Sequence, residues 1–308
     1  MGLNADDGEE AFLERLIAAR DRAADLPVPI GDDAAVFRAP AGCEIVAACD
    51  AICEGTHFRP GTPPEAIGRK ALAVNLSDFA AMGAEPRFAL VAASLPRGFS
   101  AELADRITAG LRRTAAEFGC VLAGGDTATH DGPLGLATTV IGFVRAGAAV
   151  RRDGARPGDV VAVTGALGGS FGADGMGRHL TFTPRLAEAR ALVAAGPPSA
   201  MMDVSDGLTL DLARLCRRSG VGVRLDLDRT PIHPDAGPPG PAARARAASD
   251  GEDFELLFTA PPDVFRRLLA GWRSPTPITA IGEIVPAGMT VVEGGVERPM
   301  IPRGYEHR

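Results

Sequence analysis

The sequence predicts a protein of the α/β and α+β classes, divided into two domains. Strand-like and helix-like segments alternate along the 308 residues, and this alternation is typical of layered folds. That length is sufficient for two domains of ordinary size. A cluster of turn-forming residues, "RRDGARPGD" at 151–159, lies in the middle of the chain. We therefore expect an N-terminal domain at 1–149 and a C-terminal domain at 150–308.

The first half combines apolar segments rich in β-forming residues with two helical segments. "KALAVNLSDFAAMGAEP" (70–86) predicts a largely buried helix. "SAELADRITAGLRRTAAEFG" (100–119) is amphipathic, with a serine N-cap and a glycine stop. "CVLAGGDTA" (120–128) predicts a short strand that ends in a Gly-Gly-Asp turn. The other strands are expected at 44–52, 88–96 and 134–144.

The second half repeats the alternation. "SDGLTLDLARLCRRSG" (205–220) predicts a helix with Ser205 as its N-cap and Gly220 as its stop. "HPDAGPPGPAARARAA" (233–248) predicts a surface loop that leads into a short helix. A further helix is expected at 262–272, and strands are expected at 160–165, 254–260 and 278–285.

Composition excludes several classes of protein. The net charge of −7 comes without any basic face, so a nucleic-acid partner is not expected. No apolar run reaches the roughly 18 residues that a membrane span needs. The acidic, amphipathic beginning resembles neither a signal nor a transit peptide, so we expect a cytoplasmic protein. Five irregularly spaced cysteines indicate neither a disulfide framework nor a structural zinc site.

Lysine is almost absent, because Lys70 stands alone against 31 arginines. The phosphate-binding loop G-x-x-x-x-G-K-[ST] does not surround it. The V-A-I-K lysine of protein kinases is also missing. The Tyr-x-x-x-Lys pair of short-chain dehydrogenases cannot be formed either, since the single tyrosine is Tyr305.

Aspartates recur where strands end and helices begin, usually beside glycine. Each alone is explained as a turn residue or a helix cap. Together they are hard oxygen donors of the kind that bind Mg²⁺ together with phosphates. Nearby glycines would let backbone N–H groups approach phosphate oxygens. The set consists of Asp32, Asp50, Asp78, Asp126, Asp203 and Asp206.

Asp78 has the weakest structural explanation of the six. It lies inside an apolar helix, where neither a cap nor a turn is needed. A buried carboxylate is costly unless it is paired or bound to a metal. Asn75 lies three residues earlier on the same helix face, so it could satisfy Asp78 or reach a nucleotide itself.

The glycine-rich segment "VTGALGGSFG" (163–172) admits two interpretations. As a loop after a strand it could hold phosphates at a helix N-terminus. It also contains G-x-S-x-G around Ser170, the nucleophile pattern of α/β hydrolases, although the strand ends too early for that motif. A lone histidine such as His57 is usually structural, but one seven residues after Asp50 could contact a substrate.

Several of these motifs, in this order and spacing, resemble the thiamine-monophosphate kinase family. That family belongs to the ATP-binding superfamily of aminoimidazole ribonucleotide synthetase. The resemblance extends from about residue 8 to residue 307, and "EGTHF", "GEDFEL" and the terminal Gly-Tyr are its most specific parts. The matching segments are "GDDAAV", "DAICEGTHF", "KALAVNLSDFAAMGAEP", "AGGDTA", "RRDGARPGD", "VTGALGGS", "MDVSDGL", "DGEDFELLFT" and "RGYEH".

The resemblance implies transfer of the ATP γ-phosphoryl group to thiamine monophosphate, which gives thiamine diphosphate. It implies an N-terminal mixed sheet with helices for ATP and Mg²⁺ binding and for homodimer formation, followed by an α+β domain. No residue acts as a nucleophile. His57, Glu252 and Tyr305 would contact thiamine monophosphate, and Gly125, Asp126, Arg152 and Ser205 would bind ATP. Several Mg²⁺ ions would be held by Asp32, Cys49, Asp50, Asp78, Asp126, Asp203 and Asp206.

The chain also departs from the family pattern. Ala48 and Cys49 replace small hydroxyl residues, so Cys49 could serve only through its backbone carbonyl. Asp250 stands where glycine is usual. An alternative is therefore a catalytically weakened or divergent nucleotide-binding member with another substrate. Selenophosphate synthetase and a hydrogenase-maturation dehydratase are disfavoured, because their N-terminal and C-terminal reactive cysteines have no counterpart. A serine hydrolase based on Ser170 is the remaining alternative.

Overall fold

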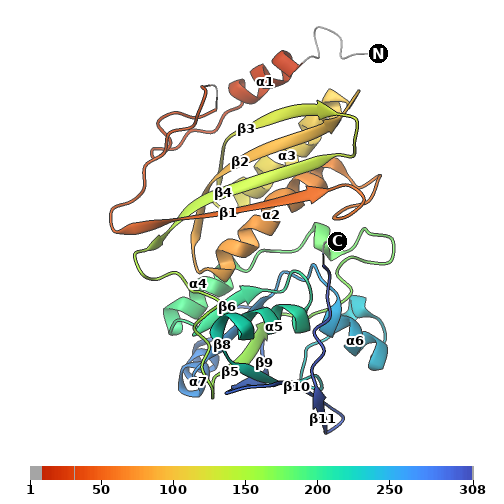
Figure 1. Cartoon of the computed structure of the whole chain (residues 1–308). Helices are drawn as coiled ribbons and strands as arrows, with labels where there is room; N and C mark the ends of the chain where they lie inside the picture. Colours follow the sequence, from red (N-terminus) through yellow and green to blue (C-terminus); the bar gives the residue numbers. More distant parts are fainter. Residues whose placement is uncertain (1–8, 31, 307–308) are drawn as a thin grey trace. The chain divides into compact units, whose positions relative to one another are not determined.

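The structure is a computed structural model that describes residues 9–30 and 32–306 (Figure 1). The chain forms two compact units. The first comprises Met1–Phe79 and Ala84–Gly147, and the second comprises Ala80–Gly83 and Ala148–Arg308. Each unit has its own sheet, so the predicted combination of α/β and α+β layers is confirmed. No helix in the described part of the chain is both long and apolar enough to cross a membrane.

The first unit contains a four-stranded mixed sheet. Its strands are β1 (Cys43–Cys53), β2 (Glu85–Pro96), β3 (Val121–His130) and β4 (Gly135–Arg145). Their spatial order is β1-β4-β2-β3, so β1 and β3 form the two edges. The β2 and β3 strands are parallel, and the other neighbours are antiparallel.

Two helices cover one face of this sheet, α2 (Pro64–Ala81) and α3 (Ala101–Glu117) (Figure 1). They approach closely where both carry glycine. A Cβ on Gly68 would lie 2.0 Å from the carbonyl oxygen of Ile107, and one on Gly110 would lie 2.2 Å from that of Glu65. Ser100 caps α3 as predicted, with its Oγ accepting the Leu103 N–H at 3.4 Å.

The segment before the sheet begins with α1 (Glu9–Ala18). Leu26 packs into a small apolar cluster with Phe88, Ala123 and Phe143. Asp25 beside it accepts two hydrogen bonds from the Arg87 guanidinium, at 2.6 and 2.7 Å. This ion pair fastens the N-terminal segment to β2.

The second unit is built on a seven-stranded sheet. Its strands are β5 (Val160–Thr164), β6 (Ala200–Asp203), β7 (Gly222–Asp226), β8 (Leu256–Ala260), β9 (Ile278–Val285), β10 (Met289–Glu293) and β11 (Val296–Pro299). They follow the order β11-β10-β7-β9-β5-β8-β6. The helical segments are η1 (Arg178–Leu180), α4 (Leu186–Ala195), α5 (Leu208–Ser219), η2 (Pro234–Ala236), α6 (Pro241–Ser249) and α7 (Pro262–Gly271).

Two local predictions are wrong. The Gly-Gly-Asp turn does not exist, because β3 continues through it to His130. A Cβ on Gly125 would lie 2.0 Å from the Val91 carbonyl oxygen, so glycine permits a close approach of two strands there. Ser205 is not a helix cap either. The α5 helix begins at Leu208, and Asp211 in its first turn accepts the N–H groups that precede it.

Candidate functional site

In the first unit, Asn75 connects the central helix to the edge of the sheet. Its side chain is fully buried, and Oδ1 accepts the backbone N–H of Asp50 at 3.1 Å. Its Nδ2 donates to the Ala71 carbonyl one turn earlier, at 3.3 Å. Because β1 is an edge strand, N–H groups on its outer side have no strand partner. Asn75 supplies a hydrogen-bond acceptor for the Asp50 N–H, and this bond positions the strand.

Asp50 and Asp78 belong to this arrangement. The sequence had indicated that Asp50 lies where a strand ends. The β1 strand continues to Cys53, so Asp50 lies inside the strand. Asp50 is level with the buried Thr138, which places its side chain on the helix-covered face of the sheet. Asp78 follows Asn75 by one turn of α2 and is partly exposed, in contrast to the fully buried Asn75.

Cys49 lies on the opposite face of β1. Neighbouring side chains in a strand point to opposite faces, and Cys49 is exposed where Asp50 is half-buried. Its thiol therefore points away from the Asp50 side, and only its backbone could share an ion with Asp50. Ala48 shares the face of Asp50 but offers no side-chain oxygen.

Asp126 is not brought to Asp50 within one chain. Across the sheet, Asp50 on β1 is level with Thr138 on β4, then Val91 on β2, and then Gly125 on β3. The edge strands β1 and β3 are therefore separated by three strand-to-strand steps. At about 4.8 Å per step, the two edges are roughly 14 Å apart. Asp126 is also exposed on the open face, beside Ala92. These two carboxylates of a single chain cannot bind the same ion.

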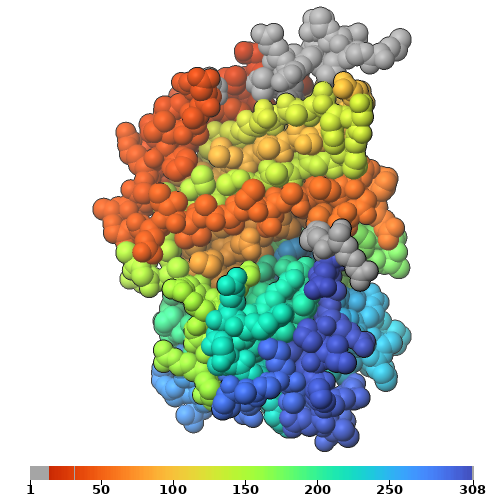
Figure 2. Space-filling view, viewed as in Figure 1, coloured from red at the N-terminus to blue at the C-terminus, as the bar shows by residue number. Residues whose placement is uncertain are grey.

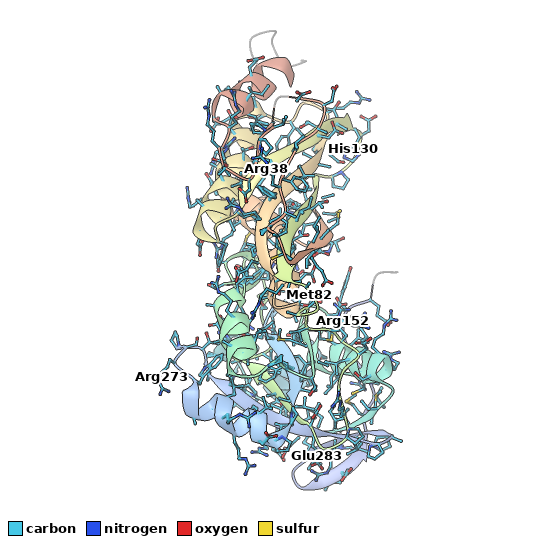
Figure 3. All side chains as sticks on the ribbon, turned by 90° about the vertical axis from the view of Figure 1, so that its left-hand side faces the viewer. Arg38, Met82, His130, Arg152, Arg273 and Glu283 are labelled. Carbon is cyan, nitrogen blue, oxygen red and sulfur yellow. The ribbon has the colours of Figure 1, made fainter. Side chains whose placement is uncertain are left out.

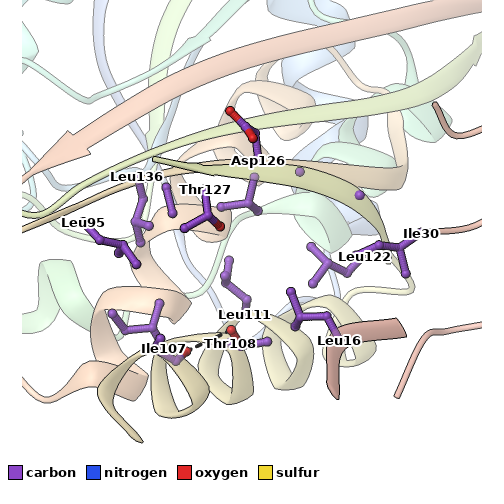
Figure 4. A pocket seen from close by; sticks show the side chains of 15 residues that line it. Leu16, Ile30, Leu95, Ile107, Thr108, Leu111, Leu122, Asp126, Thr127 and Leu136 are labelled. Atoms are coloured by element: carbon purple, nitrogen blue, oxygen red, sulfur yellow. Dashed lines mark hydrogen bonds between the residues drawn. The ribbon is translucent and has the colours of Figure 1, made fainter. Parts of the chain in front are cut away.

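Figure 4 shows the other side of the same strand, where an apolar cavity of about 80 Å³ lies between the sheet and α3. Leu111, Leu122 and Leu136 are among its lining residues, and the Asp126 carboxylate points away from it. The hydroxyl of Thr108 donates to the Ala104 carbonyl at 2.9 Å. The cavity therefore lacks the charged ligands that a metal ion needs.

Asp32 lies in an exposed turn, where its carboxylate accepts the Asp33 N–H at 2.9 Å. His57 follows β1 in a tight turn. Its Nδ1 accepts the Cys53 N–H at 3.0 Å, which places the ring proton on Nε2 in the neutral form. The His57 carbonyl accepts a 2.6 Å bond from the ammonium of Lys70, which is fully buried. The single lysine of the chain thus supports the turn that carries His57.

In the second unit, the structure gathers five of the predicted residues. The N–H of Glu252 donates to the Ser205 carbonyl at 2.7 Å, and the N–H of Tyr305 donates to the Asp206 carbonyl at 2.9 Å. Asp203 ends β6 immediately before them. These bonds join three segments that are far apart in the sequence into one cluster.

Glycines permit this close packing of loops. A Cβ on Gly251 would lie 2.6 Å from the Ser205 carbonyl oxygen. Gly207 has a φ of +123°, and a Cβ there would lie 2.6 Å from the Ser249 carbonyl oxygen. Larger residues would separate the segment that carries Asp206 from the segment that carries Glu252.

The cluster is rich in negative charge. Asp203 is 3% exposed, and Asp206 shares the Arg214 guanidinium with Asp211. Burial raises the pKa of Asp211 to about 6, and the carboxylates of Asp203 and Asp206 add to the rise. One arginine among three carboxylates leaves an excess of negative charge, and a divalent cation would relieve it.

Sequence reasoning missed Asp211, which organises this cluster from inside α5. Its Oδ2 accepts the N–H groups of Asp206 and Gly207 at 2.9 and 3.1 Å. The signal was available, because an aspartate four residues after Gly207 can reach back to the free N–H groups that begin a helix.

No three histidine, cysteine or carboxylate groups among residues 9–30 and 32–306 form a ready-made metal site. Mg²⁺ usually takes one or two carboxylates and completes its shell with water and phosphate oxygens. Asp50 and Asp78 in the first unit, and Asp203 and Asp206 in the second, are oxygen donors of this type. The residues present therefore fit magnesium ions that bind together with phosphates.

Both interpretations of the glycine-rich segment are wrong. The Gly168 N–H donates to the Asp253 carboxylate at 2.8 and 3.1 Å, and the Gly169 N–H donates to Asp250 at 3.1 Å. These amides are therefore occupied by protein carboxylates instead of phosphate. Ser170 is fully buried, and its Oγ has no hydrogen-bond partner among the described residues, so no base activates it.

Arg152 is exposed in the loop before β5, and Figure 3 labels it at the surface. Its carbonyl accepts the Ser219 hydroxyl at 2.9 Å, which fixes the loop while the guanidinium faces solvent. Tyr305 is 47% exposed, so its ring is also accessible.

The AIR synthase related protein family matches twice, with its N-terminal domain at residues 31–144 and its C-terminal domain at residues 156–294. The thiamine-monophosphate kinase of Rhodopirellula baltica is 37% identical over 316 residues, covering 97% of each chain. The chain belongs to the thiamine-monophosphate kinase family.

Solved structures of this family share the fold. The thiamine-monophosphate kinase from Stenotrophomonas maltophilia K279a is 34% identical, with a TM-score of 0.78 over 94% of this chain and 97% of that chain. AaThiL complexed with AMPPCP and TMP is 28% identical, with a TM-score of 0.76 over 88% of this chain and 89% of that chain. The predicted family membership is therefore confirmed.

Proposed function

We propose that this chain catalyses the ATP-dependent phosphorylation of thiamine monophosphate to thiamine diphosphate. The observation that carries the proposal is the second-unit cluster, in which backbone bonds tie Ser205 to Glu252 and Asp206 to Tyr305. A family whose members bear the kinase name over nearly the whole chain length supports it. The alternative of a divergent nucleotide-binding member has no such support.

The reaction is a direct in-line transfer of the ATP γ-phosphoryl group. A phosphate oxygen of thiamine monophosphate attacks the γ-phosphorus, and the bond to the ADP oxygen breaks. The attacking phosphate is already ionised at neutral pH, so no strong general base is needed. The protein contributes positioning and electrostatic stabilisation, which dominate phosphoryl transfer.

Carboxylates within each unit would hold Mg²⁺, which would neutralise phosphate charge and help to align the reacting oxygens. Asn75 ties the backbone of Asp50 to the α2 helix by a hydrogen bond. The same helix carries Asp78 and keeps its carboxylate in place. In the second unit, Arg214 orients Asp206. The residues proposed to hold Mg²⁺ are Asp32, Asp50, Asp78, Asp126, Asp203, Asp206 and the backbone carbonyl of Cys49.

The nucleotide and the acceptor are assigned to different groups. Gly125, Asp126, Arg152 and Ser205 would bind ATP, where the exposed Arg152 guanidinium provides positive charge for phosphates. His57, Glu252 and Tyr305 would bind thiamine monophosphate. A carboxylate and an aromatic ring suit its cationic thiazolium ring.

We also propose a homodimer built on the first unit. The β1 strand is an eleven-residue edge strand, and Figure 2 shows it exposed along its length (orange). Its open face carries Ile45, which is 59% exposed, followed by small residues. Such an edge favours pairing with another strand. A second copy would also bring another Asp126. An Ala47→Glu variant should then elute as a monomer in size-exclusion chromatography.

The assay combines purified protein, ATP, Mg²⁺ and thiamine monophosphate, with chromatography of both products. Thiamine diphosphate and ADP should appear in equal amounts, and omission of any component should stop both. Formation of ADP without thiamine monophosphate, or no thiamine diphosphate in the complete mixture, would contradict the proposal. We place this reaction in the cytoplasm, where ATP is supplied.

A further inference from the structure

His179 is a fully buried histidine whose two ring nitrogens are both engaged. Its Nδ1 lies 3.1 Å from Oε2 of Glu252, and its Nε2 lies 3.1 Å from the Gly175 carbonyl oxygen. The imidazole stacks on Phe171, with ring centroids 4.4 Å apart and an interplanar angle of 21°. The ring therefore has a fixed orientation.

The contacts determine where the protons lie. A carbonyl oxygen can only accept, so Nε2 must donate to Gly175. A neutral ring with its proton there would present a lone pair to Glu252. The contact at Oε2 is a hydrogen bond only if one further proton is shared between Nδ1 and the carboxyl group. A proton at that position would hold the Glu252 carboxyl group against the fixed ring and set its direction.

The backbone of Glu252 also needs to be held. Its φ is +66°, in the left-handed region that a non-glycine residue seldom adopts. The next residue, Asp253, is gripped by the Arg178 guanidinium and the Gly168 N–H. Two consecutive residues of η1 thus hold two consecutive acids. The Asp253 side chain is fully buried, whereas the Glu252 side chain is 21% exposed.

We propose that His179 is a positioning residue that aims the Glu252 carboxylate at the cationic part of thiamine monophosphate. Because its own ring is fully buried, it acts through Glu252 and does not touch the substrate. This inference rests on the proposed function, and it adds His179 to the residues that determine acceptor affinity.

The test compares variants of the full-length enzyme by steady-state kinetics. His179→Phe keeps a stacking ring but removes both hydrogen bonds. The loss of a hydrogen bond to a charged group predicts a rise of roughly tenfold or more in KM for thiamine monophosphate, with KM for ATP unchanged. His179→Asn retains a donor near the Nδ1 position and should restore most of the affinity. The matched control is His130→Phe, which removes an exposed histidine of the first unit whose Nε2 lies 3.0 Å from the Pro133 carbonyl oxygen.

A double-mutant cycle distinguishes positioning from a general structural role. If His179 acts only through Glu252, His179→Phe should have no further effect on KM in a Glu252→Gln background. An unchanged KM for thiamine monophosphate in folded His179→Phe overturns the inference. If His179→Phe does not fold, the same measurement is made on His179→Leu, and an unchanged KM for thiamine monophosphate there overturns the inference. Absence of thiamine diphosphate with the unmodified enzyme would refute the proposed function itself.

Discussion

Replacement of Asn75 by leucine tests the link between the central helix and the edge strand. Leucine has the same number of side-chain heavy atoms in the same branched arrangement as asparagine, but it is larger and cannot accept the Asp50 N–H. Asn75 is fully buried, the bond to Asp50 is part-buried, and no strand of the same unit lies on the outer side of β1 to supply another acceptor. The Ala71 carbonyl loses only a second bond, because it keeps its helical partner.

The expected loss of unfolding free energy follows from this one N–H group without an acceptor. A fully buried N–H that loses its acceptor costs about 1–3 kcal/mol, and the part-buried position of the Asp50 N–H and the larger apolar side chain lower that cost. We expect the first unit to lose about 1–2 kcal/mol of unfolding free energy. The stabilisation that Mg²⁺ confers should also shrink, because the Asp50 backbone is no longer held.

Two probes locate the effect during urea denaturation. Far-UV circular dichroism reports both units, whereas the single tryptophan, Trp272, lies in the second unit. The dichroism transition should move to lower urea while the tryptophan transition does not. Thr114→Val is the matched control, since its buried hydroxyl bonds only the Gly110 carbonyl of its own helix. A loss below about 0.5 kcal/mol in Asn75→Leu, or a shift equal to that of the control, would refute the reasoning.

Three further predictions concern charge and thiols. Asp78→Asn should lower turnover by orders of magnitude, whereas the melting temperature of the metal-free protein should stay unchanged or rise. A variant that merely unfolds would show that Asp78 is structural. Arg87 lowers the pKa of Asp25 from its ordinary value of 3.8, so this pair stabilises the fold above that value and less as pH falls through the lowered pKa. Asp25→Asn should therefore cost about 0.5–1 kcal/mol at pH 7 and nothing near pH 2, as measured by denaturation at both values. Burial raises the pKa of the Cys120 and Cys216 thiols to about 12, so maleimide at pH 8 should label the exposed cysteines of β1 and spare these two, as mass spectrometry can check.

Periodicity and capping residues were sufficient to predict most regular elements. The amphipathic pattern after Ser100 became α3 with that serine as its cap, and the apolar run before Glu283 became β9. These signals are local, because a cap or an alternating strand depends on residues a few positions away. The predicted Gly-Gly-Asp turn is absent because Gly125 packs against the backbone of Val91 on the neighbouring strand β2, a contact that local sequence does not reveal.

The list of candidate residues could likewise be read from motifs, but their grouping could not. Sequence alone placed Asp126 beside the other carboxylates, whereas the sheet order puts it on the opposite edge and face from Asp50. The same limitation hid the link between His179 and Glu252, which are separated by 73 positions in the chain. Such contacts arise from strand order and loop packing, so no local pattern encodes them.

The sequence by itself determined the family, the kinds of element and the carboxylate-rich chemistry, because motif spacing and residue type are properties of the chain. Only the tertiary structure decided what Asn75 does. Its polarity within an apolar helix was visible from the start, but its partner is the backbone of Asp50, 25 residues earlier. A side chain in a packed interior must satisfy its hydrogen bonds with whatever the fold brings to it, and that partner is chosen by packing.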